Sequence, residues 1–145
     1  MDRTRLRVDF EILPGTRLPG IPVFRLRAMI SNDSPEPAFY GVINILIDSA
    51  VTVFDTQELT SPHEIHEETL FGQVIKFKIL QRIWSSQSGL PIWLSQPLPV
   101  SFNGILIGAP RIDTYHVIGW QVTSPKMPVK KGFYRLDSFG LAPLI

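Results

Sequence analysis

Two of the three histidines and three of the thirteen acidic residues gather in one short stretch, SPHEIHEETLFG, which runs from Ser61 to Gly72. Imidazole and carboxylate groups bind zinc and carry out general acid–base catalysis. The metalloprotease motif His-Glu-x-x-His sets its histidines about four positions apart on one helix face, whereas His63 and His66 are three positions apart. A metal-dependent enzyme that uses His63, His66 and the remaining His116 is therefore one hypothesis, with a spacing that departs from the motif.

The same stretch has a simpler interpretation as a short surface helix. Ser61 is a good N-cap, Pro62 suits the first helical position, and Glu64 completes a capping box with the serine. Gly72 falls where a glycine commonly ends a helix. These signals predict one short helix near 62–71, and they favour a chain without a bound metal or cofactor.

The other signatures of catalysis are weak. Asp113 precedes His116 by three positions and could orient its imidazole, as the aspartate of a catalytic triad does, but no serine lies in a Gly-x-Ser-x-Gly motif. The chain has no cysteine, which removes thiolate nucleophiles, thiolate metal ligands and disulfides. It also has no glycine-rich phosphate loop. We therefore expect a protein that is not an enzyme.

A ligand site built from aromatic side chains is a further alternative. Trp84 and Trp93 flank the loop SSQSGLPI, and aromatic faces commonly line small-ligand sites. This loop would suit a carbohydrate or another small ligand. Trp120 lies between Ile118 and Val122 in an alternating stretch, so we expect it to pack in the core.

Basic residues form two sets that are candidates for partner binding: Arg5, Arg7, Arg25 and Arg27 near the N-terminus, and Lys126, Lys130, Lys131 and Arg135 near the C-terminus. Basic and aromatic side chains together suit nucleic-acid backbones and bases. However, Asp9 and Glu11 share the outer face of the first predicted strand, and the net charge is only +1. Residues 28–75 contain eight acids and no lysine or arginine, which favours a surface for a basic partner.

Period-two alternation of apolar and polar residues predicts strands in most of the chain. The alternating or apolar stretches are 5–13, 23–31, 39–48, 73–84, 104–108, 115–122 and 133–136. The stretch 39–48 is apolar on both faces, which indicates a central strand. Thirteen prolines and ten glycines punctuate the 145 residues, as short strands with many turns require. We predict a single all-β domain over 1–145, an antiparallel two-sheet β-sandwich of seven or eight strands, with a small barrel as the alternative.

Three segments resemble known bacterial domains. SNDSPEPAFYGVINILID is similar to the turn between two strands of bacterial immunoglobulin-like modules. PIWLSQPLPV and VIGWQVTSPKMPVKKGFYRL look like the C-terminal β-domain that follows the Schlafen-type AlbA_2 domain in bacterial ATP-binding or DNA-binding proteins. The matching positions are Trp120, Pro125, Met127, Pro128, Lys131, Gly132 and Phe133. Ser34 departs from the pattern, in which glycine is commoner, and nothing here matches the AlbA_2 domain itself.

The resemblance implies an immunoglobulin-like sandwich that serves as a non-catalytic accessory or interaction module. It would be a part of a larger bacterial cytoplasmic protein, with a protein partner or a fused domain as its target and nucleic acid as a second possibility. The N-terminal sequence lacks the apolar core of a signal peptide, and no apolar run approaches the roughly 18 residues of a transmembrane helix. We therefore expect no membrane partner.

Overall fold

The computed structural model describes residues 6–14, 23–32, 40–55, 59–60, 64–85, 98–99, 105–108, 116–123, 129–137 and 140–143. These residues form antiparallel β-structure in two sheets and contain no helix. No described segment is therefore a helix that could cross a membrane. The all-β prediction is confirmed for this part of the chain.

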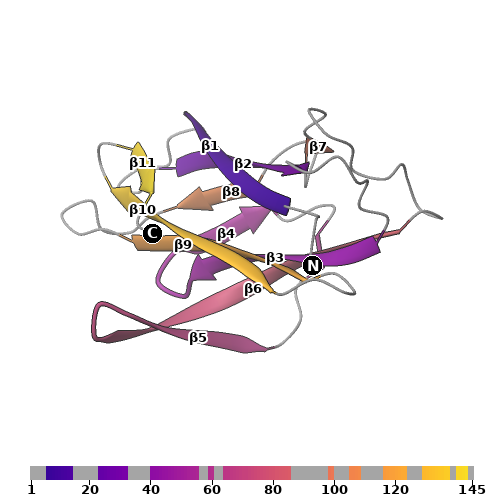
Figure 1. The fold of residues 1–145 in the computed structure, drawn as a ribbon. Coiled ribbons are helices and arrows are strands. Elements are labelled where there is room, and N and C mark those ends of the chain that lie inside the picture. Colours follow the sequence, from indigo (N-terminus) through magenta and orange to yellow (C-terminus); the bar gives the residue numbers. More distant parts are fainter. Residues whose placement is uncertain are drawn as a thin grey trace.

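The larger sheet has six strands in the order β11-β10-β9-β3-β6-β5 (Figure 1). Its strands are β3 (Tyr40–Asp48), β5 (Ile65–Leu70), β6 (Gln73–Ser85), β9 (His116–Thr123), β10 (Lys130–Asp137) and β11 (Gly140–Pro143). The predicted central strand at 39–48 is confirmed, because β3 lies between β9 and β6.

The smaller sheet has five strands, with β1-β2-β8-β4 in order and the short β7 beside β2. Its strands are β1 (Leu6–Pro14), β2 (Val23–Asn32), β4 (Thr52–Asp55), β7 (Leu98–Pro99) and β8 (Ile105–Gly108). The predicted alternation is confirmed where side chains are described. Val8 on β1 and Leu26 on β2 are buried, whereas Arg7, Asp9 and Arg27 are exposed.

One large hydrophobic cluster draws side chains from both sheets, including Val8 and Ile107 from the smaller sheet and Ile45 and Ile118 from the larger one. Phe10 of β1 and Tyr134 of β10 pack against this cluster, with their rings edge to face at 5.1 Å. The burial of this apolar surface is the main favourable term that holds the two sheets together.

Two aromatic side chains in the larger sheet cover glycines directly across from them. Phe133 is paired in register with Gly119, and Trp120 with Gly132. A Cβ built on Gly119 would lie 2.7 Å from the Phe133 ring, and one on Gly132 would lie 2.5 Å from the Trp120 ring. Each glycine is therefore the space in which the opposite ring packs, and Trp120 is a core residue as predicted.

The predicted helix near 62–71 is wrong. Residues 65–70 form β5, which pairs with β6 as a hairpin from Ile65↔Lys78 to Leu70↔Gln73. Phe71 and Gly72 make the two-residue turn, both with positive φ, at 51° and 80°. Glycine therefore serves as a turn residue where we expected it to end a helix. Ser61, Pro62 and His63 lie outside the described residues.

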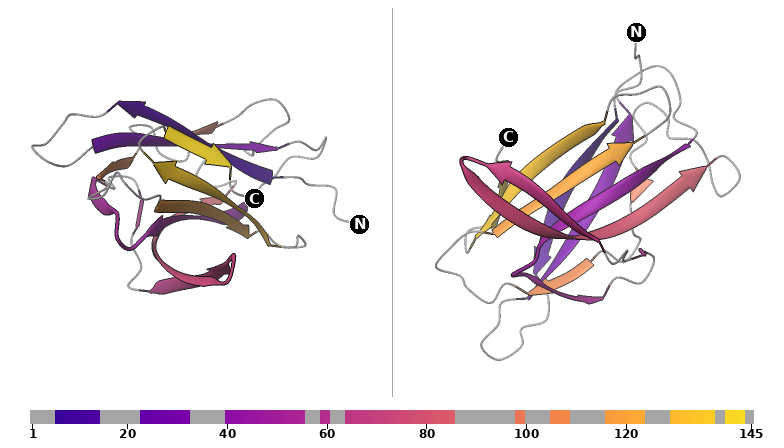
Figure 2. Two further views of the ribbon diagram at one scale, coloured as in Figure 1. Left: turned by 90° about the vertical axis from the view of Figure 1, so that its left-hand side faces the viewer. Right: turned by 90° about the horizontal axis from the view of Figure 1, so that it is seen from below.

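The hairpin of β5 and β6 curves across the face of the larger sheet that points away from the smaller one (Figure 2). We call this face the outer face. The hairpin covers only one end of it, and this division determines what the face presents to other molecules.

Candidate functional site

A second hydrophobic cluster lies beneath the hairpin, on the outer face of the larger sheet. Its buried members are Leu46, Leu70, Phe77, Ile79, Val117 and Phe133. They come from five strands, β3, β5, β6, β9 and β10. The rings of Phe77 and Phe133 are 6.0 Å apart and tilted by 37°. The hairpin therefore acts as a cover for apolar surface that the smaller sheet does not reach.

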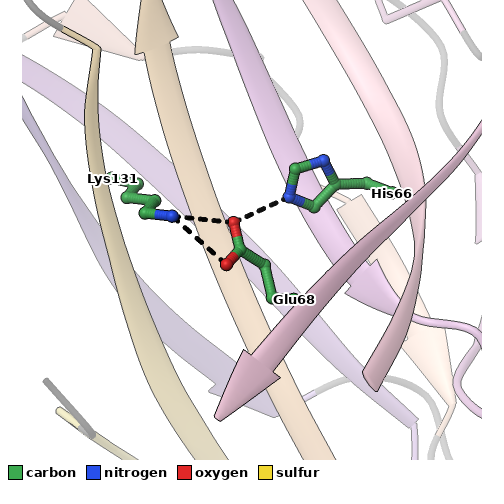
Figure 3. Close-up of polar contacts among 3 residues, drawn as sticks. All are labelled: His66, Glu68 and Lys131. Atoms are coloured by element: carbon green, nitrogen blue, oxygen red, sulfur yellow. Dashed lines mark hydrogen bonds and ion pairs between the residues drawn. The ribbon is translucent and has the colours of Figure 1, made fainter. Parts of the chain in front are cut away.

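A polar contact across the sheet holds this cover closed (Figure 3). Lys131 Nζ of β10 donates to both carboxylate oxygens of Glu68 of β5, at 3.0 and 3.2 Å. His66 Nε2 lies 2.9 Å from Glu68 Oε1, within hydrogen-bond distance. Three strands separate β5 from β10 in the sheet order, so the ion pair joins the tip half of the hairpin to the far side of the outer face. We call Glu68, His66 and Lys131 the latch.

The latch perturbs the carboxylate at its centre. Burial of Glu68 tends to raise its pKa, but the hydrogen bonds from His66 and Lys131 and their charges outweigh burial, so the pKa is lowered. The ionised form of Glu68 is therefore favoured in the folded chain. We interpret this half-buried carboxylate as structural, because both of its hydrogen-bond partners join it to the hairpin and to β10.

The metal-site hypothesis gains no support from the described residues. Within them no group of three His, Asp or Glu side chains is placed to hold a metal ion. His66 packs against Phe77 with ring centroids 6.3 Å apart, in addition to its contact with Glu68. His116 is buried at the start of β9, and His63 lies outside the described residues.

The imidazole of His116 has a carboxylate beside it, from a residue that sequence reasoning did not select. Its Nδ1 lies 3.8 Å from Oδ2 of Asp48, at the end of β3. Asp48 also accepts the backbone N–H of Ala50 through Oδ1 at 3.0 Å. Asp48 thus shapes the turn after β3 and adjoins His116, while the candidate Asp113 lies outside the described residues.

The tryptophan loop lies largely outside the described residues. The backbone of Trp84 pairs with Gly41 in the larger sheet, whereas the Trp84 side chain and Trp93 are not among the described positions. The sugar-binding alternative stays a prediction.

The arginines of the first basic set lie among acids. Arg7 Nε is 3.3 Å from Asp9 Oδ2, and Arg27 Nη1 is 4.0 Å from Glu11 Oε2, between β1 and β2. Arg25 is half-buried on β2. The exposed face of these two strands therefore carries alternating charges of both signs, which reduces its attraction for phosphate groups.

The second basic set lies mostly in a strand. Lys130, Lys131 and Arg135 all belong to β10. Lys130 is half-buried, Lys131 is held by the latch, and Arg135 is exposed. Arg5 and Lys126 lie outside the described residues.

Next to the latch, the outer face carries a row of amide side chains. Asn44 on β3 is in register with Gln81 on β6 and with Gln121 on β9. Gln81 Nε2 donates to Asn44 Oδ1 at 3.0 Å. Register partners share one face of a sheet, so three amides lie side by side there.

An aliphatic row follows the amide row. Val42 is in register with Ile83 and Thr123, and Ile83 is 58% exposed. Val129 directly precedes Lys130, which is paired with Val122 on the inner face of the sheet. By alternation Val129 therefore lies on the outer face, and it is 51% exposed. We call the amide row and the aliphatic row together the open face.

Sequence reasoning missed the open face, although one signal pointed to it. The stretch 39–48 is apolar on both sides, and a strand of that kind needs cover on two faces. The path of the hairpin decides which part of the outer face is covered. No local sequence pattern encodes that path.

No known protein family matches the chain, and no curated protein shows significant similarity to it. The observed architecture is an antiparallel all-β domain, without a family identified.

Proposed function

We propose that the chain is a non-catalytic accessory or interaction module of a larger bacterial cytoplasmic protein, and that it binds a protein partner through the open face. The finer fold in this proposal is an immunoglobulin-like sandwich, which the shared hydrophobic cluster of the two sheets supports. The resemblance of the late segments to the β-domain after AlbA_2 domains supports the accessory role.

The composition of the open face carries the proposal. Six of its register-matched side chains are uncharged, namely Val42, Asn44, Gln81, Ile83, Gln121 and Thr123. Lys131 continues the amide row beside Gln121, and its charge is paired with Glu68. Protein interfaces are depleted of charge at their centre and combine apolar contacts with hydrogen bonds. Exposed Ile83 supplies the apolar part, and the amides supply donors and acceptors.

A protein partner fits the described residues better than a nucleic acid. Phosphate binding needs cations whose charge is not already balanced. Here Arg7 and Arg27 lie close to acids, and Lys131 is engaged by Glu68. Nothing observed in the described segments favours the sugar or metal alternatives.

A photo-crosslinking residue in place of Ile83 tests the proposal in an extract of the natural host. We expect one protein to crosslink, and the purified partner to bind the wild-type chain at least about tenfold more tightly than I83D, a loss of about 1.4 kcal/mol. F71N, altered at the hairpin tip, is the matched control and should bind like wild type. Absence of a discrete crosslinked protein, or equal affinity for I83D, would refute binding through the open face.

A further inference from the structure

The outward side of the hairpin exposes apolar side chains that the chain itself does not cover. Ile65 of β5 and Val74 of β6 are both exposed, and Phe71 at the turn is 74% exposed. By alternation Ile65 and Val74 lie on the side opposite His66, Glu68 and Leu70, which face the outer face of the sheet. Three of the five exposed large apolar side chains in the described residues therefore lie in the paired part of this hairpin and its turn, residues 65–78.

Phe71 occupies a conformation that suits it poorly. Its φ is 51° and that of Gly72 is 80°, the left-handed pair of a two-residue hairpin turn. Such turns favour asparagine, aspartate or glycine at the first position, and a bulky residue with positive φ is rare. The chain bears this cost and leaves the ring exposed to solvent.

Two opposite charges complete the same surface. Glu67 and Lys76 face each other across the hairpin, and both are exposed. Neither side chain forms an ion pair or a hydrogen bond with the part of the chain that the structure describes. Both charges are therefore available to another molecule.

We propose that the outward side of the hairpin is the docking surface for a second copy of this chain. A two-fold axis parallel to the hairpin places each β5 over the β6 of the other copy. Glu67 then meets Lys76 of the second copy, and Thr69 meets its Val74. Phe71 meets Gly72 of the second copy, where a Cβ would find no atom within 4 Å, so the ring has room.

An edge-to-edge arrangement is unfavourable. If β5 paired edge to edge with its copy in the centred antiparallel register, Glu67 would lie opposite Glu68 of the second copy. Like charges directly opposite one another destabilise a strand pair. Face-to-face docking turns the same acid toward a base, so charge complementarity selects it.

The contact of one hairpin is small compared with the roughly 800 Å² per partner of a standard interface. The dimer is therefore weak, with a dissociation constant in the range of about 10 µM to 1 mM. This association goes beyond the proposed function and uses a different surface from the open face.

Charge reversal and sedimentation equilibrium test the dimer in the full chain. We expect wild type to associate below about 1 mM, and E67K or K76E alone to weaken association at least about tenfold because like charges then meet. The double reversal E67K/K76E should restore it. F71N should weaken association while its melting temperature stays equal or rises, because Asn-Gly is the preferred turn.

I83D is the matched control outside this surface and should associate like wild type. A wild-type chain that stays monomeric at about 1 mM, or a double reversal that fails to restore association, would overturn the proposal. A crosslink from position 71 to a different protein, without a dimer, would likewise show that the hairpin serves another partner. None of these results bears on binding at the open face, so failure of the two proposals is distinguishable.

Discussion

Replacing Glu68 by glutamine should loosen the hairpin. The substitution keeps the shape of the side chain and removes the charge that Lys131 contacts at 3.0 and 3.2 Å. Hydrogen bonds to charged groups contribute about 1.5–3 kcal/mol, but the Lys131 side chain is 50% exposed, so solvent screens part of the interaction. We expect the free energy of unfolding of E68Q to be lower by about 1–2 kcal/mol, which lowers Tm by about 2–4 °C for each kcal/mol.

The loss of stability in E68Q should become smaller as the pH falls. Burial tends to raise the pKa of Glu68, but its hydrogen bonds with His66 and Lys131 lower it below the ordinary 4.5. A lowered pKa means that the stabilisation is full above 4.5 and is lost as the pH falls through the folded-state value. The difference in unfolding free energy between wild type and E68Q should therefore shrink steadily under acid conditions.

Urea unfolding at several pH values measures this difference, and hydrogen exchange locates it. Amides of β5 should exchange faster in E68Q, while those of β1 and β2 should be unchanged. K131M and the double variant E68Q/K131M complete a double-mutant cycle, in which the double variant should be little worse than E68Q alone. Equal stability of E68Q and wild type at neutral pH would refute the latch, as would a difference that does not change with pH.

Two further substitutions test the packing of the larger sheet. G119A should destabilise the chain by about 1–3 kcal/mol in thermal or urea unfolding, because its Cβ would lie 2.7 Å from the buried ring of Phe133; the added F133L should recover part of the loss, and a stable G119A would contradict the packing. Burial and the charge of Asp9 raise the pKa of Tyr134 above 10.0, so stability should fall as the pH rises through and beyond that value. Y134F should lack this alkaline loss in a pH series of unfolding curves, and an identical series for the two chains would contradict it.

The sequence predicted the parts of the fold that depend on local alternation. The strands carrying Val8 and Leu26, the central position of residues 39–48 and the burial of Trp120 all follow from a period of two. In each case one face of the strand is apolar, so the pattern records which side is buried. The large hydrophobic cluster was predictable for this reason.

The hairpin was not predictable, because its inward side is mostly polar. His66 and Glu68 face the sheet together with Leu70, so IHEETL lacks an apolar alternation, and capping signals around it suggested a helix. Glu68 is acceptable in that position because Lys131, 63 residues later, meets it. A strand whose burial depends on so distant a partner leaves no local signature, and the latch was missed for the same reason.

The two halves of the outer face differ in composition, and this difference matches which half the hairpin covers. The half beneath the hairpin contains Phe77 and Phe133, and the chain covers them with its own strand. The half that contains Ile83 carries amides as well, so water solvates it at lower cost and the chain leaves it uncovered. Opening the latch would join the two halves into one continuous face. The hairpin therefore sets which part of the outer face is exposed, and Glu68 helps to hold the hairpin in place through its contact with Lys131.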